Sequence, residues 1–217
     1  MLTEATNRHS TLPLGQYTLN TKTGEICDPP PIRRFKSEIV KVGKTLIKHL
    51  RGARTIYAVV YISNPSEILR LFDEGIGNLH LVIGHQRVHS FREELTPVTV
   101  ERLIRLRNEK RLSLYVSDKV HYHSKLYICE FDEYARLING SANLTKTGTG
   151  IKGTQWNHIW VLDLVGRYED DVDYVNEMRH FETYRGKTEE FFGDFGDAFD
   201  SIEPERRVEE TLNWIAS

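Results

Sequence analysis

The stretch that decides the fold is HYHSKLYIC at residues 121–129, followed by ARLINGSAN at residues 135–143. Aromatic and β-branched residues favour extended strands, and both runs have the length of ordinary strands. FDEY at residues 131–134 is typical of a turn between them. The pattern therefore predicts a β-hairpin that carries the chain at Gly140 back toward His123.

Histidine and lysine occupy alternate positions in the first of these strands. Successive side chains of a strand point to opposite faces, so His121, His123 and Lys125 are expected on one face, with Leu126 facing the core opposite. A neutral, oriented imidazole can attack a phosphodiester and hold the phosphoryl group covalently, provided that a second group protonates the leaving oxygen. The residues expected to bind the phosphate are Lys125, Ser141 and Asn143, beside Gly140, where the backbone can approach closely.

HSKLYI and GSANLT together resemble the HxK…GSxN motif of the phospholipase D superfamily, and especially its nuclease branch. The resemblance covers residues 121–145 well, and beyond them only the order of the expected strands and helices agrees. It implies an α/β fold, namely a phospholipase D-like α/β sandwich with a central mixed β-sheet flanked by helices. It also implies a catalytic set made of His123, Lys125, Asn143 and Ser141.

Two positions depart from the family pattern. Relatives often carry an Asp a few residues after the lysine, where this chain has Glu130. They also often carry an Asn and a Glu near the strand after GSxN, where this chain has Asn157 and no glutamate. His158 follows that asparagine, between Trp156 and Trp160. The residues expected to bind substrate are Gly140, Asn157, His158 and His121.

The chain contains one HxK motif, whereas the full active site of the family contains two. The resemblance therefore implies a homodimer in which His123 of one subunit is the nucleophile and His123 of the other is the general acid, which suits a two-fold axis. No internal repeat supplies a second motif. His121 and His123 could form a His-x-His metal pair, but no Asp, Glu or Cys cluster accompanies them. Neither a metal nor another cofactor is expected.

Strand and helix patterns alternate before the hairpin, which predicts the α/β class. The expected helices are 35–49, 65–72, 98–110, 168–178 and 206–215, and the further expected strands are 55–62, 78–84 and 112–116. Residues 1–32 are expected to form an N-terminal arm or linker, and residues 33–168 the catalytic core. Residues 169–217 are expected to be an acidic, mainly helical extension of the same domain, one that can lead into a longer protein.

Charge is unevenly distributed along the chain. Residues 1–168 hold 24 Lys/Arg against 16 Asp/Glu, whereas residues 169–217 hold 5 against 15. A basic body suits a polyanionic substrate such as nucleic acid. The basic residues cluster at 33–54 and 102–111, where an ordinary solvated helix face is the alternative interpretation.

The sequence also limits the compartment. No apolar run is long enough to span a bilayer, and the N-terminus lacks the pattern of a secretory signal, so a cytoplasmic protein without a membrane partner is expected. Cys27 and Cys129 are the two cysteines, which argues against a disulfide framework.

These features favour a metal-independent endonuclease that cleaves DNA, with RNA as a second substrate class, through a covalent phosphohistidine. The expected partners are DNA, a second copy of the chain, and a fused or associated helicase or specificity module. Two alternatives stay open. One is a phospholipase or other small phosphodiester hydrolase, and the other is a catalytically silent nucleic-acid-binding or scaffold domain.

Overall fold

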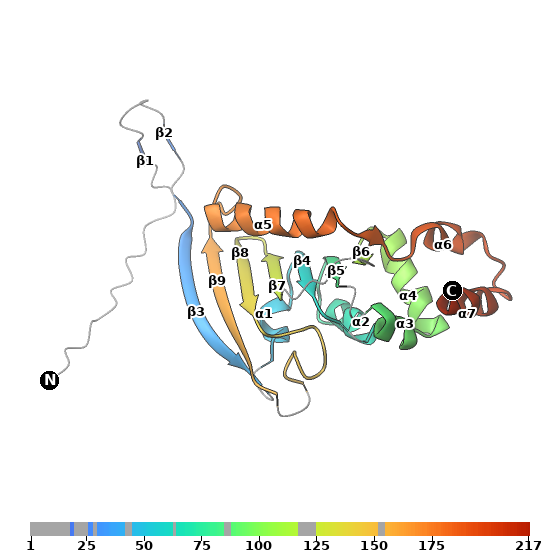
Figure 1. Ribbon diagram of the computed structural model, residues 1–217. Coiled ribbons are helices and arrows are strands. Elements are labelled where there is room, and N and C mark those ends of the chain that lie inside the picture. The colour runs from blue at the N-terminus through green and yellow to red at the C-terminus, as the bar shows by residue number, and fades with distance from the viewer. Residues whose placement is uncertain are drawn as a thin grey trace.

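The structure is a computed structural model that describes residues 30–41, 45–62, 64–84, 88–116, 125–151 and 155–217. It also describes the short strands β1 (Thr18–Leu19) and β2 (Ile26–Cys27), which pair antiparallel. The rest of the fold is built on one large sheet with helices on both faces (Figure 1). Among the described residues, no helix is both long and apolar enough to cross a membrane.

The large sheet has eight strands of mixed direction. In spatial order they are β10 (Glu189–Glu190), β6 (Leu112–Val116), β5 (Asn78–Ile83), β4 (Thr55–Val60), β7 (Leu126–Glu130), β8 (Tyr134–Gly140), β9 (Asn157–Val165) and β3 (Ile32–Val40). Strands β4, β5 and β6 run parallel, and the remaining neighbours pair antiparallel. The predicted mixed sheet flanked by helices is confirmed, as is the hairpin formed by β7 and β8.

Each face of the sheet has its own layer of helices (Figure 1). The helix α5 (Val172–Arg185) covers one face. The helices of the other face are α1 (Ile47–Leu50), α2 (Ser66–Asp73), α3 (Val88–Glu93) and α4 (Pro97–Asn108). The helices α2 and α4 begin within one residue of the predicted positions 65 and 98. The side chain of Thr96 caps α4 just before Pro97.

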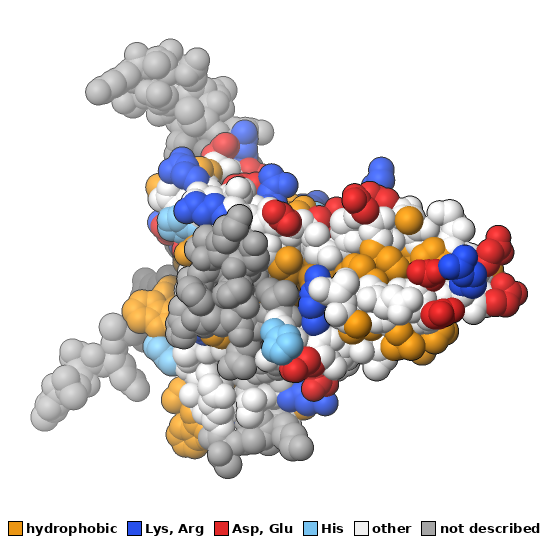
Figure 2. Space-filling view, turned by 45° about the vertical axis from the view of Figure 1, so that its right-hand side comes forward, with side chains coloured by type: hydrophobic (Ala, Val, Ile, Leu, Met, Phe, Trp, Pro, Cys, Tyr) orange, Lys and Arg blue, Asp and Glu red, His pale blue; other side chains and the backbone are white. Residues whose placement is uncertain are grey.

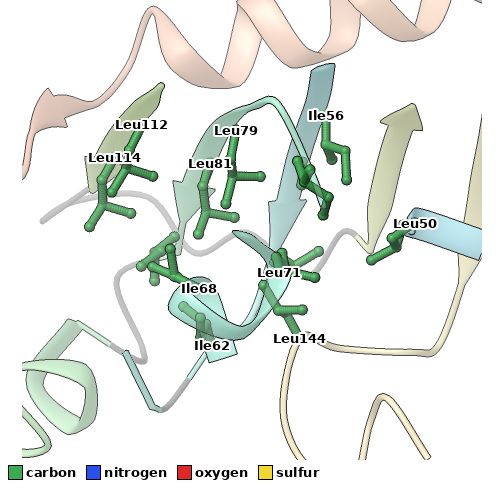
Figure 3. Packing of buried hydrophobic residues seen from close by; sticks show 14 of the residues in the cluster. Leu50, Ile56, Ile62, Ile68, Leu71, Leu79, Leu81, Leu112, Leu114 and Leu144 are labelled. Atoms are coloured by element: carbon green, nitrogen blue, oxygen red, sulfur yellow. The ribbon is translucent and has the colours of Figure 1, made fainter. Parts of the chain in front are cut away.

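The two faces carry separate hydrophobic cores because alternate strand residues point to opposite sides. In the larger core, Leu79 and Leu81 of β5 lie beside Ile68 of α2 (Figure 3). In the smaller core, Leu126 and Ile128 of β7 pack on the side of α5. The central strands are therefore buried on both faces, which fixes the register of β7 and with it the position of the motif.

The prediction of a helix at residues 35–49 is wrong. Residues Ile32–Val40 form the edge strand β3, and only Ile47–Leu50 form a helix, α1. The apolar residues near the end of this segment fit a helical spacing, but β3 pairs with β9 at nine consecutive positions, from Ile32 opposite Val165 to Val40 opposite Asn157. That long-range ladder satisfies the backbone of β3 and overrides the local pattern.

The C-terminal segment packs onto the end of the sheet and onto α4. It contributes β10, α6 (Gly193–Ala198), a 3₁₀ turn at Phe199–Ser201 and α7 (Arg207–Ala216). Phe191, Phe192 and Phe199 are buried in the larger core. The guanidinium of Arg107 forms ion pairs with the acidic Glu190 and Asp197. Acidic side chains gather at this end of the molecule (Figure 2), so part of the basic cluster at 102–111 is neutralised by the chain itself.

Candidate active site

The candidate site lies at the strand ends on one side of the sheet, where β4 and β8 end and β7 and β9 begin. Leu126 at the start of β7 pairs with both Val59 of β4 and Asn139 of β8. Gly140 at the end of β8 pairs with Ile159 of β9. The motif residues around these strand ends therefore lie in one region of the structure.

Lys125 immediately precedes β7 and is 7% exposed. Its Nζ lies 4.8 Å from the centre of the Tyr61 ring, within the range of a cation–π contact. Burial lowers the pKa of Lys125, because the charged amine loses hydration. A buried cation in contact with an aromatic ring is well suited to stabilise a phosphate oxygen in a site of low dielectric.

Tyr61 follows β4 and connects the two halves of the motif. Its backbone N–H donates to Oδ1 of Asn143 at 3.4 Å, and its carbonyl accepts from the N–H of Leu144 at 3.1 Å. Its ring contacts Lys125. The sequence does not single out this residue, because the two hydrogen bonds above are made by its backbone atoms, which carry no residue-specific signal.

The backbone at Gly140 and Ser141 fits tightly against His158. Gly140 has φ of +153°, and a Cβ at this position would lie 2.2 Å from the carbonyl oxygen of His158. The next residue, Ser141, donates its N–H to that same carbonyl at 2.9 Å, and its Oγ accepts from the N–H of His158 at 3.1 Å. Glycine is therefore required at 140, and the hydroxyl of Ser141 is held in one place.

Asn157 is 1% exposed and braces the loop that follows β8. Its Oδ1 accepts from Ser141 Oγ at 3.3 Å and from Gln155 Nε2 at 3.0 Å, and its Nδ2 donates to the carbonyl of Gly148 at 3.3 Å. A Cβ on Gly148 would lie 2.4 Å from the carbonyl oxygen of Asn143. Asn157 thus supports Ser141 directly and Asn143 through Gly148, an arrangement that favours positioning over direct contact with a ligand.

His158 is exposed and belongs to a short chain of hydrogen bonds. Trp160 donates its Nε1–H to His158 Nδ1 at 3.0 Å, and His158 Nε2 lies 2.6 Å from the hydroxyl of Ser37. The indole N–H can only donate, so Nδ1 carries no proton and the neutral ring has its hydrogen on Nε2. The imidazole is fixed on the face of the sheet that α5 also covers, close to Ser141.

His121 and His123 lie outside the described residues, so their predicted roles are not tested. By sequence, His123 stands two residues before Lys125. Across the described part of the chain, no group of three or more His, Cys, Asp or Glu side chains could hold a metal ion. The motif residues that the structure does bring together are Lys125, Gly140, Ser141, Asn143, Asn157 and His158.

Glu130, which stands near the place of the family's usual Asp, lies at the opposite end of β7 from Lys125. Its carboxylate accepts from the hydroxyl of Tyr174 of α5 at 2.5 Å and pairs with Arg54 at 3.3 Å. It therefore fastens α5 to the sheet. In the same strand, Cys129 is buried, and burial raises the pKa of its thiol to about 12, which makes the thiol unreactive.

Some solved structures are similar to this chain, whereas the sequence comparisons found no match. No protein-family model and no curated protein sequence matches the chain. Among solved structures, the chain is similar to yeast tyrosyl-DNA phosphodiesterase, with 12% identity and a TM-score of 0.46 over 72% of this chain and 42% of that one. A mutant of the same yeast enzyme has 14% identity and a TM-score of 0.44 over 59% of this chain and 30% of that one. The chain therefore spans less than half the length of these yeast structures.

Proposed function

We propose that the chain is a metal-independent phosphodiesterase of the phospholipase D type, and that it is an endonuclease cleaving DNA at a site completed by a second copy. One observation carries the proposal. Lys125 and Asn143 both contact Tyr61, just past the end of β4. These two residues come from the two halves of the HxK…GSxN pattern. His123 precedes this lysine by two residues.

The proposed reaction has two displacements at phosphorus. In the first, an imidazole nitrogen of His123 forms a bond to phosphorus as the bond to the leaving oxygen breaks, and His123 of the second copy gives that oxygen a proton. In the second, a water attacks the phosphohistidine and loses a proton to the same second histidine. The phosphorus–nitrogen bond then breaks and both histidines return to their starting protonation states.

The remaining motif residues act on the phosphate in this proposal. Lys125 supplies a fixed positive charge, and Ser141 and Asn143 supply a hydroxyl and an amide to the non-bridging oxygens. Asn157 holds Ser141 in place through the hydrogen bond described above. Because these groups are fixed before substrate arrives, they stabilise the charge of the transition state without reorganising.

DNA is the proposed substrate because the body of the chain is basic. Residues 1–168 carry 24 Lys/Arg against 16 Asp/Glu, and contacts to phosphates supply most of the sequence-independent affinity for nucleic acid. A phospholipid or other small phosphodiester is the alternative substrate, and the test below separates it from DNA. A fused or associated helicase or specificity module would supply the choice of target.

The test is cleavage by the purified full chain in excess EDTA. Labelled single-stranded DNA, duplex DNA, RNA and a detergent-dispersed phospholipid are incubated with wild type, with His123→Ala and with the control His180→Ala, whose imidazole is exposed on α5. We expect DNA cleavage by wild type and the control, and a loss of about 10³-fold or more in His123→Ala. Cleavage that survives His123→Ala would contradict the proposal.

A second readout tests the covalent step. Stopping the reaction in alkali should leave the DNA label on the denatured protein, and mild acid should release it, because a phosphorus–nitrogen bond is stable to base and labile to acid. His123→Ala should retain no label. Cleavage by wild type without any labelled protein under single-turnover conditions would favour direct attack by water.

A further inference from the structure

We propose that the hydroxyl of Tyr127 is a positioning group of the candidate active site. It holds the peptide group of Ala142, and the residues on either side of that alanine, Ser141 and Asn143, are the ones proposed to bind the phosphate. The effect of Tyr127 on catalysis rests on the proposed function. Its hold on residues 140–143, called here the GSAN segment, rests on contacts alone.

The GSAN segment runs from one strand of the sheet to another that is two places away. It leaves β8 at Gly140, and the side chain of Asn143 accepts the N–H of Tyr61, just past the end of β4. In the sheet, β7 lies between β8 and β4. The segment therefore passes over the start of β7, where Tyr127 is the second residue.

Burial alternates along this part of the chain. Ala142 and Leu144 are fully buried in the larger core, where Leu144 lies beside Leu71 (Figure 3). Ser141 is exposed and Asn143 is partly exposed. The buried neighbours therefore keep the two polar residues on the outer side of the segment, so the orientation of the peptides between them decides where their side chains point.

The hydroxyl of Tyr127 fixes one of these peptides. It donates to the carbonyl oxygen of Ala142 at 3.0 Å, and both residues are buried. Burial raises the pKa of Tyr127 well above its usual value, so the hydroxyl keeps its proton and stays a donor at ordinary pH. Because a trans peptide is planar, fixing the carbonyl of Ala142 also fixes the direction of the N–H and Cα of Asn143.

A phenol is not needed here for packing. Tyr127 is 1% exposed and its ring belongs to the larger core, where phenylalanine would fill the same space except for the hydroxyl. A buried hydroxyl with a hydrogen bond adds little net stability over an apolar group of the same shape, because its desolvation offsets most of the bond. The hydroxyl therefore contributes mainly a fixed direction to the peptide of Ala142.

Other hydrogen bonds hold the two ends of this part of the chain. Ser141 donates its N–H to the carbonyl of His158 of β9 at 2.9 Å, and Leu144 donates its N–H to the carbonyl of Tyr61 at 3.1 Å. Tyr127 holds the middle, between these two attachments. Without the middle bond, both end bonds should open more often.

The test compares two variants that each remove one tyrosine hydroxyl bonded near β7. Tyr127→Phe removes the bond to Ala142. The control, Tyr174→Phe, removes a bond to Glu130, which lies at the end of β7 opposite Lys125. Cleavage of a labelled DNA oligonucleotide by the full chain in excess EDTA gives kcat and KM. Chemical unfolding checks that each variant is folded under the conditions of the assay.

Amide hydrogen exchange, followed by NMR, measures the hold on the segment without reference to catalysis. The N–H groups of Ser141 and Leu144 are hydrogen-bonded, and we expect them to exchange about 3- to 10-fold faster in Tyr127→Phe than in wild type. In Tyr174→Phe they should exchange at the wild-type rate.

We expect Tyr127→Phe to lower kcat by about 10-fold or more with KM within about 3-fold of wild type, and Tyr174→Phe to leave both unchanged. Unchanged kcat in Tyr127→Phe, or a loss no larger than in the control, would overturn the inference. So would a loss of kcat without faster exchange, since the hydroxyl would then act by another route. Faster exchange in a chain that cleaves no DNA would sink the proposed function and leave the hold on the segment standing.

Discussion

The amine of Lys125 lies 4.8 Å from the centre of the Tyr61 ring, while the backbone N–H of Tyr61 donates to the side chain of Asn143. One residue thus positions a cation through its ring and an amide through its backbone. A substitution that changes the ring alone should separate these two contributions.

Tyr61→Leu should lower kcat for DNA cleavage by about 2- to 30-fold, because a cation–π contact contributes roughly 0.5–2 kcal/mol. Tyr61→Phe keeps the ring beneath Lys125 and serves as the matched control, with a smaller loss expected. Both variants keep the backbone bond to Asn143. Equal losses in Leu and Phe variants, measured as kcat on one substrate, would show that the ring has no part in the reaction.

The lowered pKa of Lys125 predicts the alkaline side of the pH–rate profile. Burial disfavours the charged amine, so the amine becomes neutral at a lower pH than an ordinary lysine, and an activity that needs its charge should fall earlier on the alkaline side. Lys125→Arg keeps the charge at all accessible pH values and should move this fall upward, even if kcat is lower. Lys187→Arg, at an exposed position, should leave the profile unchanged.

Gly148→Ala should impair catalysis without any change in a catalytic group. The added Cβ would lie 2.4 Å from the carbonyl oxygen and 2.9 Å from the nitrogen of Asn143, so that backbone has to move. A displacement of this kind costs about 10- to 100-fold in kcat when the displaced group acts on the reacting atoms. Gly186→Ala, at the end of α5, meets its nearest atom at 3.3 Å and is the control. Normal kcat in Gly148→Ala would argue against a role for Asn143.

The local parts of this fold were predictable from the sequence, and the long-range parts were not. The β7–β8 hairpin is encoded by two adjacent runs and a turn, and α4 by Thr96 and Pro97 at its start. The strand β3 was mistaken for a helix because its partner β9 lies more than a hundred residues away in the sequence. The two-residue strand β10 consists of glutamates, which carry no strand signal.

The residues of the candidate site also differ in whether the sequence alone could identify them. Lys125, Ser141 and Asn143 could be named from the motif, since their types and spacing suit phosphate binding. Tyr61 could not, because it contributes a ring and a backbone N–H from the position just after β4, which is distant in sequence from the motif. The contact between Phe35 and Trp160 was also missed, since a β-pairing that was not predicted is what brings the two rings together.

Stability should fall between about pH 6.5 and pH 4 because of His49. This side chain is buried, and burial lowers its pKa from 6.5 to about 4, although Glu38 beside it acts in the opposite direction. Above pH 6.5 the residue is neutral in both states. As the pH falls below 6.5, the imidazole of His49 binds a proton in the unfolded chain but stays neutral in the folded one. The free energy of unfolding therefore decreases by up to roughly 3 kcal/mol by pH 4.

Chemical unfolding measured from pH 7 to pH 4 checks this prediction. His49→Gln should flatten the decline, whereas His89→Gln, with an 87% exposed side chain, should not. Glu38 affects a different window, because a hydrogen bond from Lys48 lowers its pKa to about 2, and its contribution is lost below the ordinary value of 4.5. A decline that is the same in wild type and His49→Gln would refute the assignment.

A heterodimer of wild type and His123→Ala should be almost inactive if two copies share one site. Such a site needs His123 from one subunit as nucleophile and His123 from the other as general acid, so replacing either leaves one of the two steps without its group. Subunits that carry different affinity tags allow the heterodimer to be isolated, with a doubly tagged wild-type dimer as the control. We expect less than about 1% of the control activity, since each histidine contributes at least about 10²-fold. Retention of about half the activity would mean that each subunit has an independent site, and the second proton donor would then have to come from the same chain as its nucleophile.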